Sequence, residues 1–274
     1  MRDRRGDRQA ALRHELERRG IDVLLVTHLP NIRWLTGFTG SAGTVVVTGD
    51  RVVLVTDFRY AVQAPQEVGG SAEAVIERSS VWARVRRLLA DADPGQVGFE
   101  AQAMSVHDAE RVRGSIGNAA VATVDVVEAL RQVKDDDEVA AIRAAGSLAL
   151  DALAAVLPTI RIGERELDVA ARLEHALRVR GSEWHPFETI VASGPRSALP
   201  HARTSSRELG RGDLLLIDFG ARVDGYCADV TRTVVLGQAD QHQRTVYELV
   251  RESQQRAREG IRGGMTGREA DTLA

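Results

Sequence analysis

Residues 214–236 read LLLIDFGARVDGYCADVTRTVVL and contain the strongest strand pattern in the chain. Two apolar runs flank Asp224-Gly225, a dipeptide typical of the two-residue type I′ turn of a β-hairpin. With this dipeptide as the turn, Val223 lies opposite Tyr226. The stretch therefore predicts a long antiparallel hairpin with a fixed register.

The same register brings two acidic residues together. Counting outward from the turn pairs Gly220 with Asp229 and Asp218 with Thr231. Because side chains alternate between the two faces of a strand, Asp218, Gly220 and Asp229 share a face. The two aspartates are then diagonal neighbours across the strands, about 7 to 8 Å apart at their Cα atoms. The hairpin is expected to place two carboxylates side by side.

Two acidic side chains inside apolar strands need a compensating charge or a shared proton. Three interpretations remain open: a structural role in which the aspartates cap a bend or pair with Arg222 and Arg232, a proton-sharing pair of carboxylates, and a site for two metal ions about 3.5 to 4 Å apart. We expect Gly220, opposite Asp229, to leave room for an ion. Cys227 shares the face of Asp229 and could be a thiolate ligand, but a small buried apolar role is the favoured interpretation.

Length and composition indicate a folded protein with room for about two domains. The chain has 274 residues, of which 43% are hydrophobic and 27% charged, and its net charge is -3. This balance does not favour binding to nucleic acid or to an anionic membrane. A single cysteine excludes an internal disulfide. The N-terminus is charged and no uninterrupted apolar stretch of membrane-spanning length follows, so we expect a cytoplasmic protein that does not insert into a membrane.

The first half of the chain alternates helix-like and strand-like segments, which is typical of an α/β domain. The expected elements are a helix over 8–19, strands over 21–26, 44–48 and 52–56, a turn-rich stretch over 30–43, a helix after 60, helices over 81–90 and 105–113, and strands over 96–99 and 121–126.

A break in the apolar pattern near residue 130 predicts a domain boundary. The acidic run 135–138 suits a solvated helix start, because acidic side chains are favourable at a helix N-terminus. The elements expected beyond it are a helix from 139 to Pro158, a helix over 164–180, a strand over 189–193, a polar loop through 207, the hairpin, and a helix over 241–261.

Several motifs resemble a known family. Residues 193–201, SGPRSALPH, together with the hairpin, are similar to the proline-specific metallopeptidases of the pita-bread fold, namely the Xaa-Pro aminopeptidases and Xaa-Pro dipeptidases (prolidases). Residues 31–41, NIRWLTGFTGS, and 57–60, DFRY, resemble the creatinase-like N-terminal domain of that family. The resemblance implies a creatinase-like α/β domain over residues 1–130, followed over residues 131–274 by the first half of a pita-bread catalytic domain made of αββ repeats.

The resemblance also implies a site. Asp218 and Asp229 correspond to ligands of two divalent metal ions, most often Mn²⁺ and in some members Zn²⁺ or Co²⁺. His201 corresponds to a catalytic histidine that lies beside the metals and binds the substrate and the tetrahedral intermediate. His185 is either a substrate-pocket residue or a packing residue. The implied substrate is a peptide with proline at its second position, cleaved by an aminopeptidase or a dipeptidase, and the implied assembly is a homodimer.

The family pattern is incomplete in this sequence. The remaining family ligands are a histidine in a Gly-His-Gly-type motif and two glutamates, which follow in a second αββ half. Here Thr266 and Glu269 form a capping box for a new helix shortly before the last residue. We therefore expect a C-terminally truncated, inactive fragment that binds metal weakly. Two other interpretations remain open: a metal-free amidinohydrolase of the creatinase type, and a non-catalytic interaction protein derived from the peptidase fold.

Overall fold

The structure is a computed structural model that describes residues 3–274. The chain divides into two compact units, Met1–Asp135 and Asp136–Ala274. Each unit has its own sheet and its own hydrophobic core.

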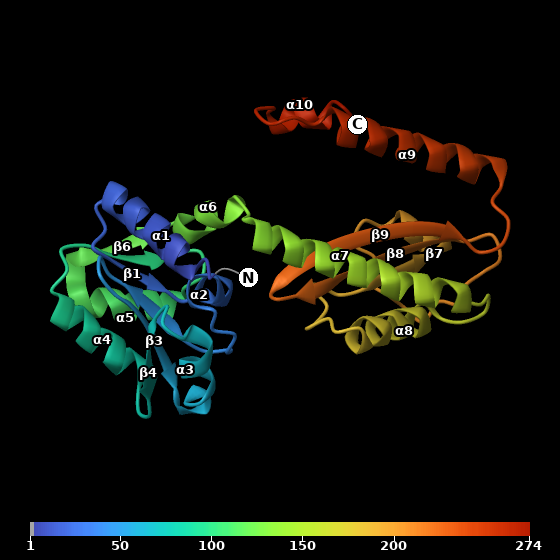
Figure 1. The fold of residues 1–274 in the computed structure, drawn as a ribbon. Coiled ribbons are helices and arrows are strands. Elements are labelled where there is room, and N and C mark those ends of the chain that lie inside the picture. Colours follow the sequence, from blue (N-terminus) through green and yellow to red (C-terminus); the bar gives the residue numbers. More distant parts are fainter. Residues whose placement is uncertain (1–2) are drawn as a thin grey trace. The chain divides into compact units, whose positions relative to one another are not determined.

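The N-terminal unit contains a six-stranded mixed sheet in the order β4-β3-β2-β1-β5-β6 (Figure 1). The central strand β2 is antiparallel to both of its neighbours, and the other strand pairs are parallel. The strands are β1 Val23–Val26, β2 Thr44–Val47, β3 Val52–Asp57, β4 Glu73–Glu77, β5 Val97–Glu100 and β6 Ala120–Thr123.

Helices cover both faces of this sheet, so its inner strands are buried on both sides. One core holds side chains from α1, α2, α3 and α6, and the other holds side chains from α4 and α5. The helices are α1 Arg5–Arg19, α2 Leu29–Thr36, α3 Gln63–Val68, α4 Val81–Ala92, α5 Val106–Ile116 and α6 Val126–Gln132, with 3-10 turns at Phe58–Tyr60 and Gly117–Ala119.

Three elements of this unit were not predicted, namely α2, β4 and α6. The stretch 30–43, predicted to be rich in turns, begins with the helix α2. Pro30 occupies its first turn, where a missing N–H costs nothing, and Ile32 and Leu35 form a buried face three residues apart. Gly37 ends the helix with a φ of 81°, in the left-handed region that glycine adopts without strain.

The C-terminal unit contains an antiparallel sheet in the order β7-β8-β9, with α7 and α8 packed on one face (Figure 1). Its elements are α7 Asp136–Val156, α8 Glu166–Val179, β7 Ile190–Ser193, β8 Leu214–Val223, β9 Tyr226–Val235, α9 Gln241–Gly260 and α10 Gly267–Asp271, with 3-10 turns at Leu157–Thr159 and Gly194–Ala198.

The predicted hairpin is confirmed in turn and register. Asp224 and Gly225 have φ values of 50° and 82°, as a type I′ turn requires. Gly220 pairs with Asp229, and Asp218 pairs with Thr231. The pattern of alternating apolar residues and the turn dipeptide together fixed this arrangement.

Alternation along β8 decides which face the helices cover. Leu215, Ile217, Phe219 and Ala221 are fully buried beneath α7 and α8. Burying a side chain as large as Phe219 stabilises the fold by roughly 1.5–3 kcal/mol. The residues between them, including Asp218, must therefore point to the opposite face of the sheet.

Helix α7 is long and apolar enough, by length and composition, to cross a membrane, which differs from the sequence-based expectation. Core helices of globular proteins also meet this criterion. One face of α7, formed by Ala145, Ala149, Ala152, Leu153 and Val156, is buried, and the helix contacts β8 and β9. Packing on the sheet therefore accounts for this one face of α7, while 28% of its most apolar window is buried in all.

The prediction of a solvated helix start over residues 135–138 is wrong for two of its residues. Glu138 is buried, and its Oε1 accepts a hydrogen bond from the Tyr226 hydroxyl at 2.6 Å. Asp135 forms an ion pair with Arg8 at 2.9 Å. The Tyr226 bond ties the tip of the hairpin to the first turn of α7.

The final helices are capped as their sequences indicate. Asp240 and Gln243 form a capping box at α9, and Thr266 and Glu269 form the predicted one at α10. None of the residues of α9, all of which the structure describes, is buried.

Candidate functional site

The open face of the β7-β8-β9 sheet carries the two predicted carboxylates. Asp218 is half-buried, Asp229 is exposed, and the Thr231 hydroxyl donates a hydrogen bond to Asp218 Oδ1 at 3.0 Å. Burial raises the pKa of Asp218, and the neighbouring Asp229 raises it further through its like charge and a side-chain hydrogen bond, against the lowering effect of Thr231. The two acids are therefore close enough to affect each other's charge, and the observed register places them as diagonal neighbours.

Arginine does not neutralise this pair. Arg222 Nε lies 3.2 Å from Glu183 Oε2, and Arg232 Nη1 donates to the Thr231 carbonyl oxygen at 2.8 Å. Between residues 3 and 274, neither Asp218 nor Asp229 has an arginine ion pair. The interpretation of the aspartates as ion-pair partners of Arg222 and Arg232 is therefore wrong.

Gly220 serves a different purpose from the one predicted. A Cβ atom at this position would overlap the Ala228 carbonyl oxygen and the ring of Pro186. The space beside Gly220 is thus filled by the loop that precedes β7, and the expectation that it would leave room for an ion is wrong. The glycine allows Pro186 to pass close over the open face of the sheet.

The same loop carries the predicted pocket residue His185. His185 directly precedes Pro186, and its ring lies against the Trp184 ring, with centroids 4.5 Å apart. Trp184 is 60% exposed. The two rings are tilted by 33° against each other and are partly exposed.

His201 lies in the loop that follows β7. It is exposed, and it is close enough to Asp218 for its charge to lower the pKa of that carboxyl, against the larger effect of burial. The structure thus brings together His201 and the two aspartates from segments 17 or more residues apart. Sequence reasoning missed the contributions of Thr231 and Pro186, although the hairpin register already places Thr231 opposite Asp218.

Cys227 does not have the buried apolar role that the sequence favoured, because it is exposed. It pairs with Arg222 across the hairpin, near the turn. Its position beside the turn, where only β8 and β9 are paired, explains the difference.

The donor set fits a divalent cation in part. Two interacting carboxylates without a compensating arginine form a negatively charged pair, and oxygen ligands of this kind suit hard divalent ions. However, the part of the chain that the structure describes contains no group of three or more His, Cys, Asp or Glu side chains placed to hold a metal. Two ligands by themselves give an open and weak site.

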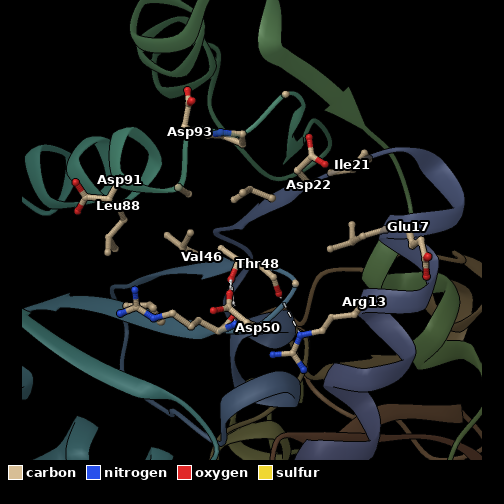
Figure 2. A pocket seen from close by; sticks show the side chains of 18 of the residues that line it. Arg13, Glu17, Ile21, Asp22, Val46, Thr48, Asp50, Leu88, Asp91 and Asp93 are labelled. Atoms are coloured by element: carbon tan, nitrogen blue, oxygen red, sulfur yellow. Dashed lines mark hydrogen bonds between the residues drawn. The ribbon is translucent and has the colours of Figure 1, made fainter.

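A depression of about 1030 Å³ lies in the N-terminal unit (Figure 2) and includes none of the hairpin residues. Its polar groups are largely paired locally: Arg13 Nε donates to the Thr48 carbonyl oxygen at 3.1 Å, and Thr48 Oγ1 donates to Asp50 at 2.7 Å. Asp22 accepts a hydrogen bond from the Gln96 backbone at 2.7 Å. These groups bind one another and hold the sheet and its loops together. We therefore keep the hairpin, with its two neighbouring carboxylates, as the candidate site.

Comparison with known proteins gives matches over both units. Residues 140–274 match metallopeptidase family M24, and residues 8–133 match the creatinase/prolidase N-terminal domain. An uncharacterized peptidase of Bacillus subtilis, YqhT, is 37% identical over 96% of this chain and 74% of its own length. A Xaa-Pro dipeptidase of Pyrococcus furiosus is 43% identical over 55% of this chain and 43% of its own length.

Solved structures agree with these matches. A Xaa-Pro dipeptidase from Bacillus anthracis superimposes with a TM-score of 0.93 at 34% identity, covering 98% of this chain and 76% of that one. An X-Pro aminopeptidase from Thermotoga maritima gives a TM-score of 0.88 at 32% identity, covering 97% and 75%. The matches confirm the resemblance and the fold class predicted from the motifs.

Proposed function

Given that the chain belongs to metallopeptidase family M24 and carries a creatinase/prolidase N-terminal domain, we propose that it is built for metal-dependent hydrolysis of the bond between an N-terminal residue and a following proline. The observation that carries this proposal is the pair of interacting carboxylates on the open face of the hairpin. The names of the relatives support the choice of Xaa-Pro substrates and include both dipeptidases and aminopeptidases.

Asp218 and Asp229 are proposed to hold two divalent ions, with Mn²⁺ preferred over Zn²⁺ or Co²⁺. When bound, such ions lower the pKa of a coordinated water and polarise the scissile carbonyl. Thr231 fixes the orientation of the Asp218 carboxylate through its hydrogen bond at 3.0 Å. Because Asp218 sits on a long paired strand, its position is set by the sheet and not by a mobile loop.

His201 is proposed to contact the substrate. An imidazole beside the carboxylate pair can donate a hydrogen bond to the oxygen that becomes negatively charged in the tetrahedral intermediate. His185, which directly precedes the Pro186 ring that packs against Gly220, is proposed to line the substrate pocket. Neither histidine is needed as a metal ligand for these roles.

Residues 3–274 hold only two of the side chains that a closed dinuclear site requires. We therefore propose that this chain by itself binds Mn²⁺ weakly and hydrolyses Xaa-Pro peptides very slowly or not at all.

The remaining proposals are a division into domains over residues 1–130 and 131–274, a cytoplasmic location and a homodimer.

The test combines metal binding with hydrolysis. Mn²⁺ is titrated calorimetrically into chelator-stripped wild type, Asp229→Asn and the control Asp224→Asn, which changes an exposed aspartate of the same hairpin. We expect weak binding in wild type and the control and none in Asp229→Asn. Equal Mn²⁺ binding by all three proteins would show that the hairpin is not the metal site. Turnover of Ala-Pro at a typical enzymatic rate, about 1 s⁻¹ or more, would contradict the proposal that this chain is inactive by itself.

A metal-free hydrolase of the creatinase type is the second candidate. It is favoured by the raised pKa of Asp218, because burial and the neighbouring Asp229 both favour the protonated carboxyl, and two neighbouring carboxylates can share one proton without a metal. Activity toward an amidino substrate that survives chelation would establish this alternative. Loss of all hydrolysis on chelation, with recovery on adding Mn²⁺, would exclude it.

A further inference from the structure

Glu166 is a fully buried carboxylate outside the hairpin. It is the first residue of α8, and its side chain makes five short polar contacts. Oε1 accepts hydrogen bonds from the backbone N–H and the hydroxyl of Ser193, both at 2.8 Å. Oε2 accepts from the backbone N–H and the hydroxyl of Ser205 at 3.1 and 2.6 Å, and from Arg196 Nε at 3.3 Å. One carboxylate thus joins two segments that are twelve residues apart.

These two segments are the ends of the loop that carries His201. Ser193 is the last residue of β7, and Ser205 follows His201 by four positions. The first end of the loop is held near the site by the sheet, because it follows β7, and Ile190 of β7 pairs with Asp218 of β8. Glu166 holds the other end at the same place by binding Ser205. Glu166 therefore joins both ends of the loop to the start of α8.

The base of the loop has further ties, among them the Arg207 guanidinium, which donates to the Ser193 hydroxyl, and the Leu167 N–H, which donates to the Ser205 carbonyl oxygen at 3.1 Å. Arg196 donates to the Arg203 carbonyl oxygen, and the Thr204 hydroxyl accepts from the Val191 N–H at 2.9 Å and donates to the Thr189 carbonyl oxygen at 2.8 Å. None of these contacts joins both ends of the loop to α8. Glu166 does, which makes it the central anchor.

Glu166 acts as an anion at neutral pH. Burial by itself would raise the pKa of Glu166, but the hydrogen bonds from Ser205 and Ser193, with the nearby charge of Arg196, lower it overall. Hydrogen bonds to an ionised acceptor are about twice as strong as neutral ones. The anchor therefore depends on the charge of the carboxylate as well as on its shape.

We propose that Glu166 is a positioning residue that holds the 194–204 loop so that His201 faces the carboxylate pair of the hairpin. The consequence for hydrolysis rests on the proposed function, whereas the anchoring of the loop does not. Glu166 touches neither His201 nor the two aspartates, so its effect on the reaction must pass through the loop.

The anchoring is tested by amide hydrogen exchange on wild type, Glu166→Gln and Glu166→Ala. The control is Glu164→Gln, because Glu164 also begins this helical region and pairs with Arg172 at 2.7 Å without a side-chain contact to the loop. We expect exchange over residues 193–205 to rise about tenfold in Glu166→Gln and more in Glu166→Ala, since a buried acceptor is lost. Exchange over the hairpin should stay unchanged, and the control should resemble wild type.

Two exchange results would overturn the proposal. Unchanged exchange over 193–205 in both Glu166 variants would show that the carboxylate does not hold the loop. An equal rise over the loop and the hairpin would show that Glu166 stabilises the whole unit and does not position one segment. If Glu166→Ala fails to fold, Glu166→Gln decides, because it keeps the shape of the side chain.

The link to His201 is tested by a double-mutant cycle of Glu166→Gln and His201→Ala, measured as hydrolysis of Ala-Pro with Mn²⁺. Because this chain is proposed to turn over very slowly, the comparison applies to the residual hydrolysis of wild type, which Glu166→Gln should lower about tenfold, with no further effect in His201→Ala. A loss of the same size in both backgrounds would show a general structural effect and overturn the positioning role. Absence of hydrolysis in wild type agrees with the proposed inactivity of this chain by itself, and the exchange experiment then decides the anchoring.

Discussion

Replacing Asp229 by asparagine should stabilise the metal-free protein while weakening metal binding. The substitution keeps the size of the side chain and removes one of two like charges that lie as diagonal neighbours across the hairpin. The pKa of Asp218 is raised by burial and by Asp229, which shows that the folded state disfavours charging both acids. Removing one charge relieves this repulsion.

The magnitude follows from the geometry of the hairpin. Two unit charges about 6 Å apart repel by roughly 0.7 kcal/mol at the dielectric constant of water and by roughly 2.8 kcal/mol at an effective value of about 20. Asp229 is exposed, so the result should lie toward the lower end, at about 1 kcal/mol. For a unit of this size, 1 kcal/mol corresponds to a rise in Tm of about 3 °C.

The pH dependence has a definite sign. A carboxyl whose pKa is raised on folding lowers stability only where it is ionised in the unfolded chain. The penalty is absent below about pH 4, the unfolded pKa of aspartate, grows as the pH rises toward the folded pKa of Asp218, and is complete above it. The advantage of Asp229→Asn should therefore be present at pH 8 and disappear below about pH 4.

The assay is urea unfolding of chelator-treated wild type, Asp229→Asn and the control Asp224→Asn at pH 8. High salt should reduce the advantage of Asp229→Asn, since the screening length falls to about 3 Å at 1 M. Added Mn²⁺ should stabilise wild type more than the variant and reverse the order. If Asp229→Asn is no more stable than Asp224→Asn without metal, the carboxylates do not repel each other and the reasoning is refuted.

Three further predictions concern the packing around the site. Phe219→Ala, which empties a fully buried position, should lower the free energy of unfolding by about 3–5 kcal/mol in urea titrations. Gly220→Ala should cost about 1–3 kcal/mol in the same titrations by pushing Pro186 off the sheet, and should increase amide exchange over 182–189 but not in α8. The pKa of Glu166 is lowered on folding, so its contribution is present above about pH 4.3 and is lost as the pH falls through its folded pKa. The difference in urea midpoint between wild type and Glu166→Gln should therefore shrink in acid.

The parts of the fold that the sequence predicts well are governed by local rules. Asp224-Gly225 determines the hairpin turn, and alternation then determines the face on which Asp218 lies. Helix α2 was missed because Pro30 and Gly37 mark turns as readily as they mark helix ends. The burial of Glu138 was missed because its partner, Tyr226, lies 88 residues away.

Glu166 shows most clearly what a sequence pattern cannot reveal. Its partners Ser193 and Ser205 lie 27 and 39 residues away, and a glutamate in the first turn of a helix is adequately explained by the helix dipole. Only the tertiary structure shows that this carboxylate is buried and joins both ends of one loop. The hairpin carboxylates can be recognised from sequence because one strand pair positions them, whereas the position of His201 depends on contacts between segments that no local period connects.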